Sequence, residues 1–214
     1  MISFKNIKLF LFLTSFLIGS SQDKSTPTEI WEPIPKVVYS SSDSAPPNDA
    51  IILFDGTDLS RWNAKWSKKE SKWKINNDGS MTVVFDGSGG IETKQKFGSV
   101  QLHIEWQTSE DVSHKNQKRS NSGVFFQDRY EIQILDSYKS PTYVNGQAGS
   151  VYKQHIPLVN ASRKPGEWQS YDIVFDAPEF NSDGKKIKSG YFTVFHNGIL
   201  IQNHVEIFGT TTNV

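Results

Sequence analysis

Residues 121–138, with the sequence NSGVFFQDRYEIQILDSY, place acid–base side chains inside an otherwise strand-like stretch. One arginine, three carboxylic acids and two glutamines lie among Val, Ile, Phe and Tyr, which favour β-strands. Strands that only fill a core do not need polar groups at this density. The carboxylates could act as general acids or bases, and the amides could bind the hydroxyl groups of a ligand.

Strand geometry predicts where these polar groups point. Successive side chains of a β-strand project to opposite faces. In YEIQILD (130–136), Glu131 and Gln133 therefore lie opposite three apolar residues, and in LHIEW (102–106), Glu105 does the same. We expect the apolar faces to form the core. The polar faces would then converge on the outer, concave surface of one sheet, provided that their strands are neighbours.

Such a surface has the chemistry of a sugar site, in which carboxylates and amides bind hydroxyls and aromatic rings stack on the sugar. Arg119, in RSNSG (119–123), adds a fork of hydrogen-bond donors for carbonyl or hydroxyl oxygens. The alternative is a solvated sheet face or a structural ion-pair network, because antiparallel sheets often have one wet face. The candidate stacking residues are Trp62, Trp66, Trp73, Tyr138, Tyr152 and Trp168.

Composition excludes several other classes of protein. The 23 basic and 23 acidic residues give a formal net charge of zero, so no basic excess points to nucleic acid. The absence of cysteine excludes disulfides and thiolate zinc sites. The five histidines show no HxH or HExxH spacing, and we predict no metal site. The sequence also contains no Gly-x-Ser-x-Gly nucleophile elbow.

The chain divides into three segments by composition. Residues 1–21 have two lysines, an apolar run over 9–18 and then small residues, which is typical of a secretory signal peptide. A membrane anchor is the alternative, but the run is roughly half of the ~20 residues that span a bilayer. Residues 22–50, rich in Ser, Thr, Pro and Asp, indicate a linker or extended lead-in. We expect a periplasmic or secreted protein with one domain over 51–214 and no remaining membrane anchor.

Short apolar or alternating runs separated by turn signals cover that domain, and no long run has a helical period. This pattern predicts an all-β fold, a two-sheet antiparallel jelly-roll sandwich. The expected strands are residues 51–54, 72–76, 80–85, 90–94, 99–107, 122–127, 130–135, 149–152, 168–175, 190–196 and 199–203.

Several motifs lie along the domain, among them LFDGTDLSRW (53–62), SNSGVFFQDRYEIQILDSY (120–138) and TVFHNGILIQNHVEIFGTT (193–211). Together with the other matching stretches, they resemble the 3-keto-disaccharide hydrolase family, over roughly residues 51–212. The resemblance implies a concanavalin A-like lectin/glucanase fold. Members of the family usually continue with a further strand, so the resemblance predicts that this chain lacks the C-terminal strand. The matching stretches are LFDGTDLSRW (53–62), WKINNDGSM (73–81), IETKQKFGSVQLHIEW (91–106), SNSGVFFQDRYEIQILDSY (120–138), GSVYKQHIPLVNASRKPGEWQSYDIVFDAPEF (149–180) and TVFHNGILIQNHVEIFGTT (193–211).

The resemblance implies cleavage of a glycosidic bond in a sugar already oxidised at C3, a small-molecule carbohydrate substrate. The C3 ketone acidifies the C2 proton, so a base can form an enolate and the C1 substituent can leave by elimination, followed by addition of water. We assign catalysis to Glu131, Glu105 and Arg119. We assign sugar binding to Gln133, Asn121, Tyr152, His155, Asp136 and Trp168. A divalent cation such as calcium could serve as the electrophile, but no loop of closely spaced acids supports one and we predict no cofactor.

Two alternatives share this fold. A non-catalytic carbohydrate-binding module would need the same aromatic and amide groups. A conventional endo-glucanase usually places two acids on one strand face, whereas EIQILD (131–136) supplies one acid of the required parity. The Glu131–Gln133 pair beside Arg119 is more than a binding module needs, and this favours an enzyme.

Overall fold

The computed structural model describes residues 29–42, 45–67, 69–84 and 89–211. The expected signal peptide lies outside these residues, as does part of the expected lead-in. The chain forms two compact units, Met1–Ile52 and Leu53–Val214. In the described part of the first unit, a bridge joins Ser40 to Pro47. None of the described residues belongs to a helix that is long and apolar enough to cross a membrane.

The regular secondary structure described in the second unit consists of short β-strands and two short 3₁₀ helices in the connections. Every strand pair in the described residues is antiparallel. The elements are β1 (Trp62–Ala64), β2 (Lys74–Ile75), β3 (Met81–Thr82), β4 (Ile91–Thr93), β5 (Val100–Gln107), η1 (Asn116–Lys118), β6 (Ser122–Phe126), β7 (Tyr130–Ile134), η2 (Val144–Gly146), β8 (Trp168–Asp176), β9 (Glu179–Phe180), β10 (Lys186–Lys188), β11 (Tyr191–His196) and β12 (Ile199–Glu206).

The largest sheet has the strand order β12-β11-β8-β5. Strands β5, β8 and β11 alternate between more buried and more exposed residues, as in β8, where Tyr171, Ile173 and Phe175 are buried. This alternation fixes the register, because a slip of one residue would turn every apolar side chain to solvent. The sheet therefore presents one apolar face to the core.

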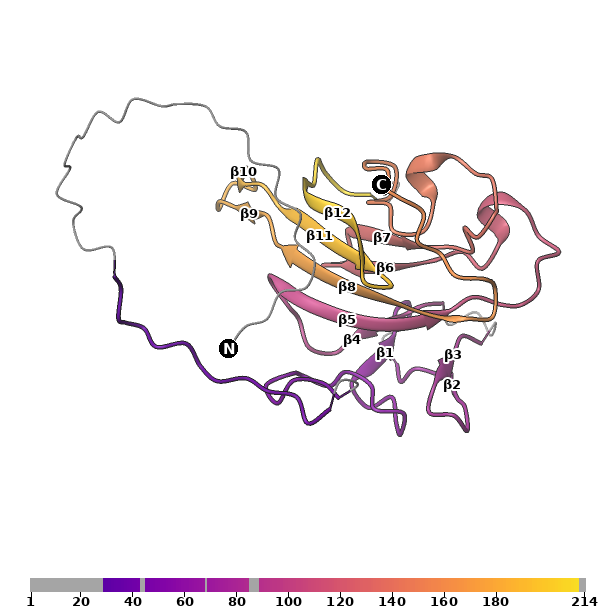
Figure 1. The fold of residues 1–214 in the computed structure, drawn as a ribbon, viewed down its shortest axis with the longest axis horizontal. Coiled ribbons are helices and arrows are strands. Elements are labelled where there is room, and N and C mark those ends of the chain that lie inside the picture. The colour runs from indigo at the N-terminus through magenta and orange to yellow at the C-terminus, as the bar shows by residue number, and fades with distance from the viewer. Residues whose placement is uncertain (1–28, 43–44, 68, 85–88, 212–214) are drawn as a thin grey trace, which may run out of the picture. The chain divides into compact units, whose positions relative to one another are not determined.

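The second layer is the β6–β7 hairpin, which lies behind the four-stranded sheet in Figure 1. Residues 149–152 extend this layer, because the Gly149, Ser150 and Tyr152 backbones exchange hydrogen bonds with β7. Rings from both layers meet in the core, where Phe126 of β6 lies 4.9 Å from Phe175 of β8. The expected all-β, two-layer antiparallel sandwich is thus confirmed.

Individual strands differ from the expectation where local sequence is ambiguous. Residues 51–54 form no strand, and residues 149–152 contribute an isolated bridge at Val151 to β7. The stretch 181–190, which has the Gly and Asn of a turn, contains β10 paired with β9. Strands this short depend on one partner's hydrogen bonds, so sequence pattern alone identifies them poorly.

One polar residue, His196 on β11, lies inside the core. Its ring packs between Trp106 and Tyr171, and its Nε2 lies 2.8 Å from Gln169 Oε1. Burial lowers the pKa of His196 to about 4. The imidazole is therefore neutral at physiological pH, with Nε2–H donating to the glutamine oxygen, and it serves the core.

Candidate functional site

The burial of the Glu131 side chain is the least expected feature of the second layer. It projects from β7 on the face opposite the core, yet only 8% of the residue is exposed. Its backbone is bonded, with the amide donating to Thr211 Oγ1 and the carbonyl accepting from Tyr152. Among the described residues, the carboxyl group itself has no hydrogen-bond partner. A buried carboxyl without partners is costly to ionise, and such groups are concentrated at functional sites.

Burial raises the pKa of the Glu131 carboxyl to about 7, against the opposing effect of the nearby Lys153 and Lys65 ammonium groups. A carboxyl with this pKa exchanges its proton near neutral pH. This is the property that a general acid or base requires.

Gly123 on β6 provides the space that the Glu131 carboxyl occupies. A Cβ atom at Gly123 would lie 2.2 Å from Glu131 Oε1, so any side chain there would displace the carboxyl. Gly123 has no unusual backbone dihedral that would otherwise require glycine. Its role is therefore to make room across the β6–β7 pair.

Two tyrosines lie over the same face. Tyr143, at the start of η2, and Tyr152 bring their hydroxyl oxygens to 2.6 Å from each other. Tyr152 follows Val151, whose side chain is in the core, so Tyr152 points to the Glu131 face. The Tyr143 hydroxyl reaches this face through its contact with the Tyr152 hydroxyl.

Lysines and an aromatic ring complete the surroundings of Glu131. Phe125 is its register partner on β6, so the two side chains share a face. The Lys65 ammonium lies 5.0 Å from the Phe125 ring centroid and pairs with Asp128. The Lys153 ammonium lies 5.3 Å from the Tyr152 ring centroid. Cations on both sides of an exposed ring and a carboxyl suit a polar ligand with an apolar face.

Gln133 is the neighbouring side chain on the same face of β7, and it is only 1% exposed. Its Nε2 donates to Gln117 Oε1 at 3.1 Å and to Gly146 O at 3.4 Å. The Asn121 side-chain amide Nδ2 donates to two oxygens of the same Gln117, the backbone oxygen and Oε1. Gln133 Oε1 is buried without a partner. An orphaned buried acceptor is a place where a ligand or water donor would be stabilised.

The structure pairs Arg119 with Asp136. Arg119 Nε donates to Asp136 Oδ2 at 2.8 Å, and Nη2 contacts the same oxygen. Asp136 Oδ1 also accepts from the Tyr138 backbone amide. With its side chain only 2% exposed, Asp136 is occupied in holding the segment after β7. The structure thus gives Arg119 an internal partner in place of the predicted ketone.

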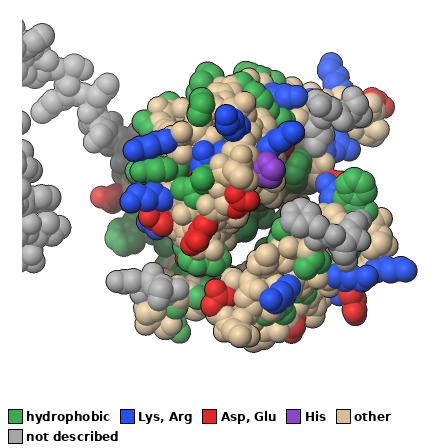
Figure 2. Space-filling model, turned by 90° about the vertical axis from the view of Figure 1, so that its right-hand side faces the viewer, with side chains coloured by type: hydrophobic (Ala, Val, Ile, Leu, Met, Phe, Trp, Pro, Cys, Tyr) green, Lys and Arg blue, Asp and Glu red, His purple; other side chains and the backbone are tan. Residues whose placement is uncertain are grey.

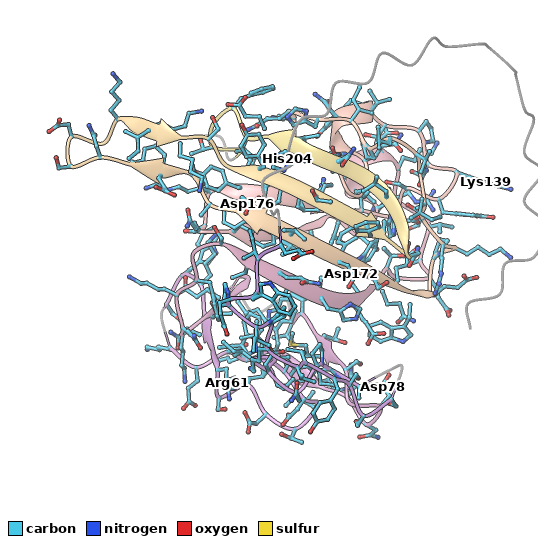
Figure 3. All side chains as sticks on the ribbon, turned by 60° about the vertical axis from the view of Figure 1, so that its left-hand side comes forward. Arg61, Asp78, Lys139, Asp172, Asp176 and His204 are labelled. Atoms are coloured by element: carbon cyan, nitrogen blue, oxygen red, sulfur yellow. The ribbon has the colours of Figure 1, made fainter. Side chains whose placement is uncertain are left out.

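Glu105 does not meet Glu131, and the expected convergence of their strands is wrong. β5 pairs with β8, whereas β7 pairs with β6 in the other layer. Glu105 therefore lies on the outer face of the four-stranded sheet, with the core between the two carboxyls. Trp168, at the start of β8, shares that outer face, which also carries the His103–Asp172 pair at 2.7 Å. Figure 3 shows Asp172 on this sheet and Lys139 on the segment after β7.

His155 also lies away from the Glu131 carboxyl. Its Nε2 lies 2.6 Å from the backbone oxygen of Glu206 at the end of β12, and its ring packs on Phe208. These contacts join the segment after residue 152 to the C-terminal part of the domain. The histidine thus has a structural role here.

The expected open trough over β7 is also different in the structure. Glu131 and Gln133 do point away from the core, but both are buried, and η1 and η2 lie over this face, where Gln117 Oε1 and Gly146 O accept from Gln133 Nε2. Two surface hollows lie elsewhere, one lined by residues that include Leu53 and Arg61 and the other by residues that include Val144 and Pro157. The candidate site is therefore a covered face around one carboxyl.

Charge on the surface has no dominant sign. Figure 2 shows Lys and Arg side chains interspersed with Asp and Glu over one face. Among the described residues, no group of three or more His, Asp or Glu side chains could hold a metal ion.

Sequence reasoning missed four contributors to this site, namely Gly123, Tyr143, Gln117 and Lys65. Gly123 could have been found, because it lies two residues before Phe125, the β6 residue that pairs with Glu131. Tyr143 lies just before η2, Gln117 lies in η1, and Lys65 lies in the turn after β1. Only the fold brings them together.

Comparisons with known proteins agree with this architecture. The sequence model of the 3-keto-alpha-glucoside-1,2-lyase-like domain matches residues 49–214. A crystal structure of a candidate glycosyl hydrolase from Parabacteroides distasonis ATCC 8503 is similar, with a TM-score of 0.82 and 48% identity, covering 87% of this chain and 80% of that one. A second candidate glycosyl hydrolase from that organism shares the fold, with a TM-score of 0.51 and 18% identity over 73% of this chain and 70% of its own. A search of curated proteins found no match.

The fold and the covered carboxyl site thus belong to a β-sandwich of the carbohydrate-active class. This chain is a member of the 3-keto-alpha-glucoside-1,2-lyase-like domain family. The family and the 48% identical neighbour support a carbohydrate-processing enzyme.

Proposed function

We propose that this protein cleaves 3-keto-glycosides, including 3-keto-disaccharides, by elimination at C1–C2, with Glu131 as the base. The observation that carries the proposal is the buried Glu131 carboxyl, which lacks a hydrogen-bond partner and has a pKa raised to about 7. An elimination needs one well-placed base, which this site has. Ordinary glycosidases need two carboxyls flanking one bond, and Glu105 lies on the other sheet.

The reaction begins when the Glu131 carboxylate takes the C2 proton of the sugar. The C2–H electrons form an enolate with the C3 carbonyl. The enolate then collapses to form the C1=C2 double bond, the C1–O bond breaks, and the leaving oxygen takes up a proton. Protonated Glu131 can return the proton that it took, so atoms and charge balance. Addition of water across the double bond would complete a net hydrolysis.

Other groups at the site support binding of such a sugar. Phe125 and Tyr143 expose rings that can stack on the apolar face of a pyranose. Gln133 Oε1 offers an unused acceptor for a sugar hydroxyl, and Asn121 steadies Gln133 through Gln117. Arg119 and Asp136 act beneath the site, by fixing the segment that covers it.

Substrate choice tests the proposal. The purified protein would be incubated with a 3-keto-disaccharide and with the same disaccharide unoxidised, and released monosaccharide would be measured. We expect release from the oxidised sugar only. Release from the unoxidised sugar would favour a conventional glucanase. Binding of sugar without release from either would favour a carbohydrate-binding module, and both outcomes contradict the proposal.

The substitution Gly123→Ala is expected to reduce turnover of a 3-keto-glucoside with little loss of stability. The new methyl group would overlap the end of the flexible Glu131 side chain, which can rotate away at low cost but loses its position. We expect a loss in kcat/KM of about 100-fold. Gly98→Ala, where nothing lies within 4 Å of a new Cβ atom, is the matched control. Unchanged kcat/KM in Gly123→Ala would show that the carboxyl position does not matter.

The pH dependence of kcat/KM should follow the Glu131 carboxyl. Its pKa is raised to about 7, so the base form dominates above that pH and is lost below it. We expect kcat/KM to rise about tenfold per pH unit below neutrality and to level off above pH 7. Initial rates across the range from about pH 5 to about pH 9 measure this profile. A plateau that begins near the ordinary glutamate value would contradict the assignment.

A further inference from the structure

The steps proposed for Glu131 leave the pair of tyrosine hydroxyls, Tyr143 and Tyr152, without a role. Tyr143 and Tyr152 come from different parts of the covering segment, and their oxygens lie 2.6 Å apart. Their ring centroids are 6.3 Å apart and tilted, so the contact is through the hydroxyls and not through stacking. Tyr143 is 43% exposed, so a bound ligand can reach it.

The hydrogen-bond count leaves one hydrogen of this pair unused. One hydroxyl donates to the other, and the acceptor keeps its own O–H for a third group. Among the described residues, neither hydroxyl has another partner. A hydroxyl that accepts a hydrogen bond is polarised and becomes a stronger donor. The pair is therefore a donor directed at something that the protein itself does not supply.

Both tyrosines are held in place by backbone. The Tyr143 ring lies against Gly146, where a Cβ atom would fall 1.9 Å from Tyr143 Cε2. The Tyr152 amide donates to the Glu131 carbonyl at 3.1 Å, which ties the second tyrosine to the strand that carries the base. Donors fixed before the substrate arrives lose little freedom when they bind a developing charge.

The protonation state suits a donor. Partial burial, the hydrogen bond with Tyr152 and the negative charge of Glu131 together raise the pKa of Tyr143 to about 12. The hydroxyl therefore keeps its proton at every pH at which the Glu131 carboxylate can act. Tyr143 is thus unsuited to be a second base.

We propose that the Tyr143–Tyr152 hydroxyl pair donates a hydrogen bond to the C3 oxygen of the substrate as this oxygen becomes an enolate. The inference rests on the proposed function, in which Glu131 removes the C2 proton. C2 and C3 are adjacent atoms, so base and donor must lie on neighbouring positions of one face. Tyr152 meets this condition, because its backbone pairs with that of Glu131 and its side chain projects to the Glu131 face, where its hydroxyl contacts that of Tyr143. The hydrogen bond stabilises the negative charge that the C2–H electrons place on the C3 oxygen. This charge passes to the leaving oxygen when the C1–O bond breaks.

Exchange of the C2 proton separates stabilisation of the enolate from protonation of the leaving oxygen and from a purely structural role. The wild type, Tyr143→Phe and Tyr152→Phe would be incubated in D₂O with a 3-keto sugar that has no leaving group at C1, and deuterium at C2 would be followed by NMR. Elimination would be measured in parallel on 3-keto-glucosides with a good and a poor leaving group. Tyr191→Phe, on β11 of the other layer, is the matched control, and thermal unfolding checks each fold.

Both substitutions in the pair should slow exchange and elimination by about 100-fold, equally for the two leaving groups. Tyr191→Phe should leave both rates unchanged. If Tyr143→Phe and Tyr152→Phe exchange the C2 proton at the wild-type rate, the inference is overturned. This holds whether their elimination rate is unchanged or falls only for the poor leaving group. Failure of the proposed function looks different, because the wild type would then exchange no C2 proton, and both ideas would fall.

Discussion

Replacing Glu131 with Gln should lower kcat for a 3-keto-glucoside by about 100- to 10,000-fold, the usual contribution of a general base. Glutamine has almost the same shape but cannot take a proton, so substrate binding should change little. Release of the leaving group under saturating substrate measures the effect. The matched control is Glu105→Gln on the other sheet, which should retain activity because the core separates it from the site.

The same substitution should stabilise the fold above neutral pH, which guards against the explanation that the variant is unfolded. The unfolded carboxyl ionises near 4.5, but the folded one ionises near 7, so between these values the folded chain holds a proton that the unfolded chain has lost. Wild-type stability therefore falls as the pH rises through this window, by about 3 kcal/mol. Glu131→Gln lacks this loss. Urea unfolding of both proteins at low and high pH measures this loss of stability. An equal change in the free energy of unfolding with pH in the two proteins would contradict the raised pKa of Glu131.

Replacing Arg119 with Met should destabilise the domain by about 3 kcal/mol or more. The Asp136 side chain is 2% exposed and the Arg119 side chain 15%, so loss of the guanidinium leaves a buried carboxylate without its charge partner. Urea denaturation measures the free energy of unfolding. The expected loss of stability is large because the Arg119–Asp136 pair is buried. An exposed ion pair contributes little to the free energy of unfolding.

A second variant tests the cause of this loss. Arg119→Met combined with Asp136→Asn removes the unpaired charge and should recover part of the stability. Lys188→Met, which breaks the exposed Lys188–Glu179 pair, should have almost no effect. Equal losses in the Arg119 and Lys188 variants, or no recovery in the double variant, would show that the buried charge is not responsible.

Strand parity could be read from the sequence because it depends only on the period of two along each strand. Glu131 and Gln133 do lie opposite the apolar side chains of β7, and Glu105 lies opposite those of β5. The sequence does not encode in the same local way which strands become neighbours. β5 pairs with β8, about sixty residues later, and this long-range choice placed Glu105 and Trp168 on the other layer.

Burial of the site could not be read from strand parity either. Antiparallel sheets often leave one face to water, and the polar pattern of β7 agrees with that expectation. Instead, η1 and η2 lie over this face, where Gln117 Oε1 and Gly146 O accept from Gln133 Nε2. This cover turns an ordinary surface glutamate into a carboxyl with a pKa near 7, and it supplies the tyrosine pair.

The ionisation of Glu131 itself is the most direct test of this account. NMR of the protein with ¹³C-labelled glutamate, compared with Glu131→Gln to assign the signal, gives the pH at which this one carboxyl titrates. A midpoint near 7 is the predicted result. A midpoint near the ordinary glutamate value of 4.5 would mean that the carboxyl is hydrated or paired in solution, and the proposed base would be wrong.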